Sequence, residues 1–183
     1  FFFLDDDAEF HGNALLALLE RKLPIVCAFS SQKMPPFTPT LYSRFVAADG
    51  SAASTFVATT EAGRVNDSPP VGAENFIDAE LKGRRGLHAV AACGRQGMLV
   101  QREVFESLDP PWFRLGQWNP EKCQEDIEFC WRAYLKGYSI FCDLDVRFGH
   151  SDTVATWVTQ LEDGTWARML RWPGGETVTV RTV

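Results

Sequence analysis

Three groups of residues in this chain have the types and spacing needed to bind and transform a ligand. In the first group, Asp5, Asp6 and Asp7 directly follow the apolar run FFFL. Like charges this close repel one another unless a cation neutralises them, and Mg²⁺ and Mn²⁺ prefer carboxylate oxygens. In an extended segment Asp5 and Asp7 share a face and Asp6 points away. The pattern favours an Asp-x-Asp pair that holds a divalent metal or a ribose, with a solvated acidic turn as the alternative.

The second and third groups lie further along the chain. Glu125 and Asp126 begin the segment EDIEFCWRAYLKGY, where one of them could act as a general base on an acceptor hydroxyl. Acidic residues are also favoured in the first turn of any helix, so capping is the alternative. His150 ends the segment SIFCDLDVRFGH, and its neutral imidazole could join distant aspartates as a metal ligand. A lone histidine is more often a surface or core residue.

Alternating strands and helices would position these residues. FFFL and PIVCAFSS are apolar runs typical of buried parallel strands, and HGNALLALLERK between them has helical spacing. A second helix over QEDIEFCWRAYLKGY precedes a strand over SIFCDLDVRFGH. This order predicts an α/β fold with a mixed, mainly parallel sheet flanked by helices. The tail alternates around EDG, which predicts a β-hairpin appendage. We expect one domain over residues 1–150 and a β-rich tail over 151–183.

Composition narrows the class of protein. The 183 residues are 45% hydrophobic and 23% charged, in the range of globular proteins. A net charge of −6 argues against a nucleic-acid partner, whose binding face is usually basic. The five cysteines are odd in number and lack C-x-x-C spacing, which favours free thiols and a cytoplasmic protein. No stretch approaches the roughly 20 apolar residues of a membrane span.

Taken in order, three segments resemble nucleotide-sugar glycosyltransferases of the type A fold, in particular the family-2-like group. The segments are FLDDDAEF, then GMLVQREVFESL with PPWF, then EDIEFCWRAYLKGYSIFCDLDVRFGH. The resemblance covers most of residues 1–42 and 87–150. It implies a partial, Rossmann-like catalytic domain over residues 1–150. The implied reaction is metal-dependent transfer of a hexosyl group from a nucleotide-diphosphate sugar to a hydroxyl of a carbohydrate or other acceptor.

The resemblance also implies a nucleotide and metal site. Asp5 and Asp7 match the family's Asp-x-Asp motif, and His150 matches a late histidine that completes the metal site in many members. By this match, Asp5, Asp7 and His150 hold a manganese or magnesium ion, and Asp5 and Asp6 lie at the nucleotide.

Further positions match the acceptor and donor-sugar side of the family's site. Asp126 matches the usual catalytic base, with Glu125 beside it near the acceptor. Gly94 sits in the donor-sugar loop. Trp112 and Phe113 match an aromatic pair beside the acceptor pocket, with core packing as the alternative for this pair.

Two departures from the family qualify these expectations. Arg95 and Gln96 replace the usual small residues after the loop glycine, which bears on the donor sugar. The family also has a preceding half of roughly one hundred residues that binds the nucleoside. We therefore expect a fragment or one piece of a longer protein, poorly stable or inactive alone, with that N-terminal half as a candidate partner. The alternatives are a non-catalytic sugar or sugar-nucleotide binding module and another carboxylate-metal enzyme, such as a phosphoesterase.

Overall fold

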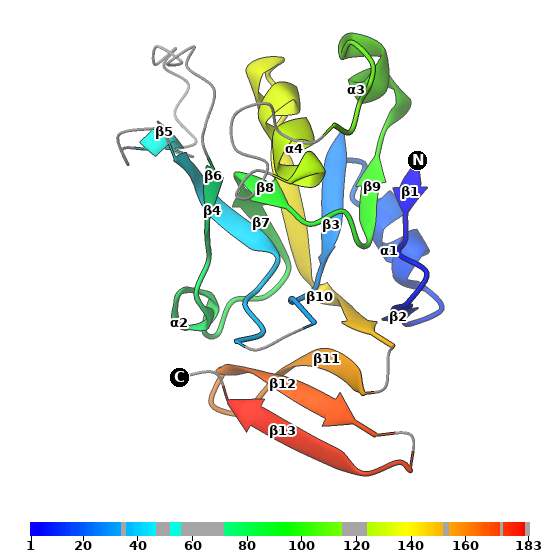
Figure 1. Cartoon of the computed structure of the whole chain (residues 1–183), viewed down its shortest axis with the longest axis vertical. Coiled ribbons are helices and arrows are strands. Elements are labelled where there is room, and N and C mark those ends of the chain that lie inside the picture. The colour runs from blue at the N-terminus through cyan, green and yellow to red at the C-terminus, as the bar shows by residue number, and fades with distance from the viewer. Residues whose placement is uncertain are drawn as a thin grey trace.

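The computed structural model describes residues 1–33, 36–46, 52–55, 72–114, 124–151, 154–172 and 174–181. Figure 1 shows the helices and strands found within these ranges. The helices are α1 (Ala14–Glu20), α2 (Asp78–Leu81), α3 (Arg102–Ser107) and α4 (Glu125–Leu135). The strands are β1 (Phe2–Phe3), β2 (Ala8–Phe10), β3 (Ile25–Phe29), β4 (Leu41–Val46), β5 (Ala52–Thr55), β6 (Gly72–Asn75), β7 (Leu87–Val90), β8 (Ala92–Cys93), β9 (Met98–Val100), β10 (Ile140–His150), β11 (Ala155–Gln160), β12 (Trp166–Arg171) and β13 (Thr177–Arg181).

The strands form two sheets. The larger has the order β1-β9-β3-β10-β11-β12-β13, and β2 and β7 also pair with β10. In the smaller sheet β4 lies between β5 and β6 and also pairs with β8. Strands β3 and β10 run parallel, with Ile25 opposite Ile140 and Cys27 opposite Cys142. Among the described residues, every other strand pair is antiparallel.

The α/β class and the mixed sheet are therefore confirmed, whereas the expectation of a mainly parallel sheet is wrong. An apolar strand buries its side chains equally well in either direction, so hydrophobic content does not fix strand polarity. The expectation of a buried parallel strand over FFFL is wrong for the same reason. Its strand β1 lies at the edge of the described sheet, antiparallel to β9, and Phe1 is 66% exposed.

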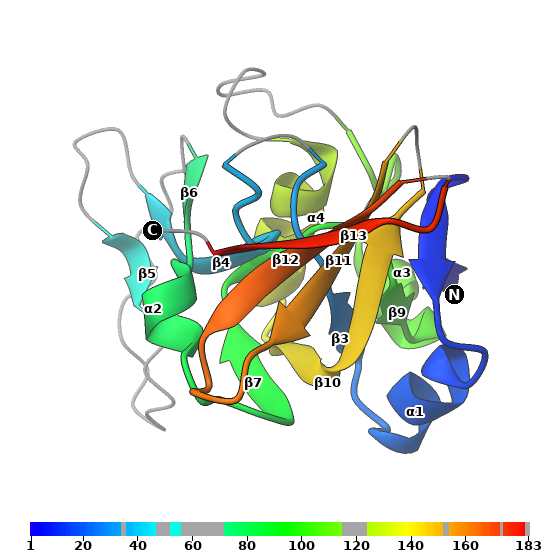
Figure 2. The same cartoon turned by 90° about the horizontal axis from the view of Figure 1, so that it is seen from below.

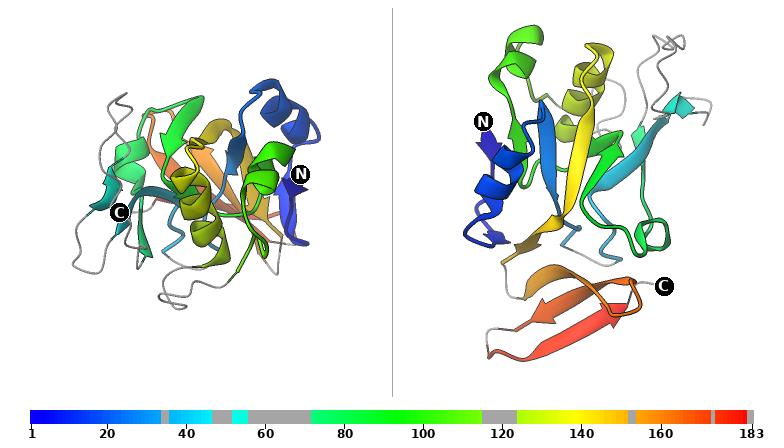
Figure 3. Two further views of the ribbon diagram at one scale, coloured as in Figure 1. Left: turned by 90° about the horizontal axis from the view of Figure 1, so that it is seen from above. Right: turned by 180° about the vertical axis from the view of Figure 1, so that it is seen from behind.

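The larger sheet carries helices on both faces. Successive residues of a strand point to opposite sides. Accordingly, Ile25, Cys27 and Phe29 of β3 join a core that includes residues of α3 and α4, while Val26 and Ala28 join a second core with α1. The two views of Figure 3 show α1 apart from α3 and α4, with β3 and β10 between them. The apolar spacing of α1 and α4 predicted both helices, and the structure confirms them.

The tail is an antiparallel meander of β11, β12 and β13 that crosses the underside of the chain (Figure 2). The predicted hairpin around EDG is present as β11 and β12. Trp166 donates its indole N–H to the carbonyl of Leu81 at 2.7 Å. The fully buried Arg168 donates to an Asp78 carboxylate oxygen at 3.1 Å and to the carbonyl of Phe37 at 3.0 Å. These contacts pack the tail against α2 and the β3–β4 loop, while a domain boundary at residue 151 stays a prediction.

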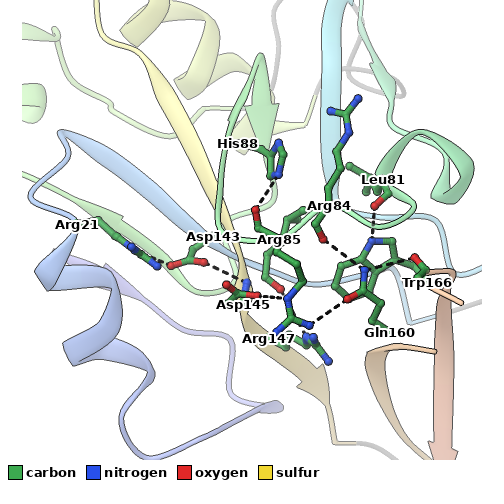
Figure 4. A network of polar contacts seen from close by, with 12 residues as sticks. Arg21, Leu81, Arg84, Arg85, His88, Asp143, Asp145, Arg147, Gln160 and Trp166 are labelled. Carbon is green, nitrogen blue, oxygen red and sulfur yellow. Dashed lines mark hydrogen bonds and ion pairs between the residues drawn. The ribbon is translucent and has the colours of Figure 1, made fainter. Parts of the chain in front are cut away.

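A polar network crosses the irregularity in β10 between Asp143 and Arg147 (Figure 4). Arg21, the residue after α1, pairs with the buried Asp143 at 2.8 Å, and the other carboxylate oxygen of Asp143 accepts the Asp145 N–H at 3.1 Å. Arg85 pairs with Asp145 at 2.7 Å and donates to Gln160 of β11 at 3.0 Å. The network therefore links α1, β10 and the tail.

Two sequence expectations concern the thiols and the membrane. Cys27, Cys93, Cys130 and Cys142 are buried and free, as expected, and Cys123 lies outside the described residues. Within the described ranges, the helices are all too short or too polar to cross a membrane.

Candidate functional site

The main pocket, with a volume of about 520 Å³, lies at the carboxyl ends of β3 and β10. In α/β sheets this is the usual place for a ligand. The segment after β3, the start of β4, the β8–β9 loop, the first turn of α4 and the turn after β1 all contribute to its wall. The lining residues are Asp5, Ser30, Gln32, Lys33, Thr40, Tyr42, Gly94, Arg95, Gln96, Gln124, Glu125, Asp126 and His150. The structure thus brings together five of the predicted site residues, Asp5, Gly94, Glu125, Asp126 and His150, from distant parts of the sequence.

The predicted metal ligands Asp7 and His150 face each other at the side of this pocket. The Asp7 Oδ2 and His150 Nδ1 atoms are 3.5 Å apart, and both side chains are mostly buried. The His150 Nε2 atom lies 2.9 Å from the carbonyl oxygen of Ser31. Because a carbonyl only accepts hydrogen bonds, Nε2 carries a proton, and in the neutral ring Nδ1 then presents a lone pair toward Asp7.

A lysine supplies positive charge to this pair. The Lys33 ammonium forms an ion pair with Asp7 Oδ2, the same oxygen that faces His150. Burial would raise the pKa of Asp7, but the hydrogen bond from Lys33, the charge that His150 carries when its ring is protonated, and the charge of Lys33 together hold it below its ordinary value. Asp7 is therefore an ionised carboxylate at neutral pH.

Asp5 and Asp6 differ in their surroundings. The carboxylate of Asp5 lines the pocket and lies 3.5 Å from the Arg95 guanidinium, which is 3.8 Å from Glu125 on its other side. Asp6 is exposed and is not among the described lining residues, and because Asp6 and Asp7 lie in a turn, the expected extended segment with Asp5 and Asp7 on one face is not found. Its predicted contact with a nucleotide stays a prediction.

Asp126 is the most perturbed carboxylate of the pocket. Its residue is only 9% exposed, and burial raises its pKa to about 6, with a smaller contribution from the negative charge of Glu125. The backbone N–H of Ile127 donates to its Oδ1 at 2.7 Å and, with the Arg95 backbone N–H, opposes this rise. A carboxylate with this pKa can accept a proton near neutral pH and release it again, as a general base must.

The β8–β9 loop forms another part of the wall. A side chain at Gly94 would place its Cβ 3.0 Å from the Cβ of Thr40, so the loop approaches β4 closely at this point. Gln96 is buried, and its Nε2 donates to the carbonyl of Gly149 at 3.0 Å. The Oε1 atom of Gln96 has no hydrogen-bond partner among the described residues, so this side chain retains an acceptor at the pocket wall.

The aromatic pair lies elsewhere. The Trp112 indole donates to the carbonyl of Phe105 at 3.0 Å, and the ring of Phe113 stacks on Phe129 with centroids 4.6 Å apart. Neither Trp112 nor Phe113 is among the described lining residues of the pocket. Both belong to an aromatic cluster that includes Phe3, as the packing alternative predicts. Their predicted contact with an acceptor stays a prediction.

Sequence reasoning did not assign a role to several lining residues. Lys33 follows the carboxyl end of a predicted strand, which is a usable signal for a ligand site, but the prolines around it indicate only irregular structure. Tyr42 carries no local signal, since only the tertiary fold brings it to Asp126. Burial is the larger cause that raises the pKa of Tyr42, and the negative charge of Asp126 raises it further.

A search for metal-binding groups limits the cation site. The described residues include no group of three or more histidine, cysteine, aspartate or glutamate side chains arranged to hold a metal ion. The predicted set of Asp5, Asp7 and His150 is therefore not found as one group, and a cation here would have Asp7 and His150 as its protein ligands of these types.

Comparisons with known proteins add little. No family model matches the sequence, and no curated protein matches it. The chain is similar to a solved structure described as "Crystal Structure of A197 from STIV", with 13% sequence identity and a TM-score of 0.45. The match covers 98% of this chain and spans 64% of the length of that chain. A likeness at this level carries no argument about fold or function.

Proposed function

We propose that this chain carries the site of a metal-dependent glycosyltransferase of the type A fold. It would transfer a sugar from a nucleotide-diphosphate donor to an acceptor hydroxyl, with Asp126 as the general base. The observation that carries the proposal is the buried Asp126, with a pKa of about 6, in the same pocket as Asp5 and the histidine of the Asp7–His150 pair.

The Asp7–His150 pair fits a divalent cation that is shared with a diphosphate. Two ligand atoms bound at about 2.1 Å are about 3.0 Å apart at a right angle and about 4.2 Å apart on opposite sides, and the observed 3.5 Å lies between these values. An ionised carboxylate and an imidazole lone pair are both suitable donors for manganese or magnesium. Magnesium is commonly held by one or two carboxylates with substrate phosphates and water, so two protein ligands suffice. When bound, such a cation would offset the negative charge on the leaving diphosphate.

The protein's own groups account for the remaining steps. Asp126 would accept the proton of the acceptor hydroxyl, which requires the hydroxyl oxygen within about 3.2 Å of the carboxylate. Glu125 and the Arg95 guanidinium lie beside it and would bind polar groups of the acceptor or donor sugar. Asp5 would face the nucleotide.

The test combines binding and turnover. Titration calorimetry with uridine diphosphate and guanosine diphosphate, with and without Mn²⁺, should show metal-dependent binding of one of them. With the matching nucleotide sugar, Asp126→Asn should lower donor turnover by about 10²- to 10⁴-fold and leave nucleotide binding within about twofold. Glu162→Gln, an exposed carboxylate in the β11–β12 turn, is the matched control.

Two results would contradict the proposal. Nucleotide binding that does not require a divalent cation would contradict the cation site at Asp7 and His150. Undiminished turnover in Asp126→Asn would contradict the role of Asp126 as general base. Binding without any turnover in the wild-type chain would favour the sugar-nucleotide binding module instead.

A further inference from the structure

We propose that Lys33 is an internal counter-ion of the cation site and a diphosphate ligand in the loaded site. In the absence of a ligand it neutralises Asp7, and on binding of cation and nucleotide it moves from Asp7 to the diphosphate. This inference rests on the proposed function and deepens it, because it names how the chain recognises the diphosphate of the donor.

Lys33 and a bound divalent cation would compete for one atom of Asp7. The ammonium of Lys33 forms its ion pair with Asp7 Oδ2, and that oxygen is also the one that faces His150 Nδ1. A divalent cation held between Asp7 and His150 must bind the same oxygen. A second cation at contact distance from the same carboxylate oxygen is repelled by the first, which weakens the contact between Lys33 and Asp7. Binding of the metal therefore displaces the ammonium.

The displaced ammonium of Lys33 has to change partner. Lys33 lines the pocket, and its side chain is 46% exposed, so the side chain borders the space that a ligand fills. Lysine carries its charge on a flexible four-carbon stem, and it binds phosphate as a point charge. A diphosphate that shares the cation with Asp7 lies next to this stem and supplies the negative charge that the ammonium has lost.

The other arginine and lysine charges near the ligand space do not meet the same conditions. Among the described lining residues, Arg95 is the only further arginine or lysine, and its guanidinium lies between Asp5 and Glu125 rather than on Asp7. A cation at Asp7 and His150 would leave both of those contacts in place. Arg95 is therefore a fixed charge of the pocket, whereas Lys33 has to change partner.

This exchange predicts opposite effects of one substitution on two binding steps. Lys33→Gln removes the competitor for Asp7 and should tighten binding of Mn²⁺ alone by about fivefold, the value expected for loss of a partly exposed ion pair. The same change removes a charged phosphate ligand. It should weaken binding of the diphosphate at saturating Mn²⁺ by about tenfold or more.

The experiment is titration calorimetry on the whole chain. Mn²⁺ is titrated first, and then uridine or guanosine diphosphate, whichever the wild type binds, is titrated at saturating Mn²⁺. The variants are Lys33→Gln and Lys136→Gln, and the latter removes the same charge at the exposed end of α4. Circular dichroism verifies that both variants fold, and Lys33→Arg tests whether a charge at this position restores nucleotide binding.

We expect Lys33→Gln to bind Mn²⁺ more tightly and the diphosphate more weakly than the wild type, and Lys136→Gln to change neither affinity. Weaker binding of both Mn²⁺ and nucleotide, or no change in either, would overturn the inference and leave the proposed function standing. A wild-type chain that binds Mn²⁺ and nucleotide independently of each other would overturn both.

Discussion

Replacement of Asp126 by asparagine tests the energetics of the pocket without any substrate. Burial is the chief cause that raises the pKa of this carboxylate from its ordinary value of 3.8 to about 6. The folded chain therefore binds a proton more tightly than the unfolded chain does, and stability from this group is fully present below about pH 3.8. It is lost as pH rises toward 6 and stays lost above that value. Ionised Asp126 thus destabilises the fold at neutral pH.

The magnitude follows from the size of this shift. A difference of about two units, at 1.36 kcal/mol for each unit, amounts to about 3 kcal/mol at pH 7.5. At pH 4.5 the same two pKa values leave about 1 kcal/mol. Asparagine cannot ionise, and its side-chain oxygen can still accept the Ile127 N–H. Asp126→Asn should therefore raise the free energy of unfolding by about 3 kcal/mol at pH 7.5 and by about 1 kcal/mol at pH 4.5.

Urea denaturation followed by circular dichroism at the two pH values measures this effect. Glu162→Gln should change the free energy of unfolding by no more than about 0.5 kcal/mol at either pH, because its carboxylate is exposed. A variant Asp126→Asn that is no more stable than the wild type, or whose gain does not grow with pH, would refute the reasoning. In that case burial would not hold the pKa of Asp126 above its ordinary value.

Three further predictions concern the pocket and the fold. Glu125→Gln removes a negative charge that raises the pKa of Asp126, so the acid limb in the pH profile of kcat/KM should move below about pH 6. An acid limb that stays in place would contradict the electrostatic coupling between Glu125 and Asp126. Arg168→Met removes the ion pair between the buried Arg168 and Asp78 and should lower the free energy of unfolding by about 3–5 kcal/mol in urea denaturation, with part of the loss recovered when Asp78→Asn is added. An equal loss in the double variant would show that packing dominates. Gly97 has φ +71°, and a Cβ there would lie 2.9 Å from a side chain of β3. Gly97→Ala should therefore lower the free energy of unfolding by at least about 1 kcal/mol. An unchanged midpoint of urea denaturation would count against the tight packing of this turn.

Helices α1 and α4 and the strand segments of β3 and β10 could be predicted from the sequence because their signals are local. The apolar spacing of residues 125–135 defines α4, and its first turn places Asp126 at a helix N-terminus. Strand direction could not be predicted, since burial of FFFL and PIVCAFSS satisfies either polarity. The antiparallel partner of β1, strand β9, begins directly after a turn at Gly97, whose tertiary contacts the sequence does not show.

The candidate site was predictable in its residue types and not in its pairings. A run of three aspartates signals a need for positive charge, but it does not say which cation supplies it. In the fold, Arg95 of the β8–β9 loop forms an ion pair with Asp5, and Lys33, which follows β3, forms an ion pair with Asp7. The burial of Asp126 likewise depends on distant segments around it rather than on its own helix. Such pairings follow from tertiary contacts, which a single sequence does not display.

The two residues of the cation site, Asp7 and His150, belong to parts of the fold that we expect to unfold locally at different rates. His150 ends β10, whose last residues pair on both sides with β2 and β11, whereas Asp7 lies in a short turn before β2. Amide hydrogen exchange of doubly paired central strands is governed by the opening of large units, and surface turns exchange through small local openings. A cation that joins the two would give the turn some of the protection of the strand. Slower amide exchange at residues 5–7 on addition of Mn²⁺ would thus report occupancy of the site in the folded chain, independently of any turnover.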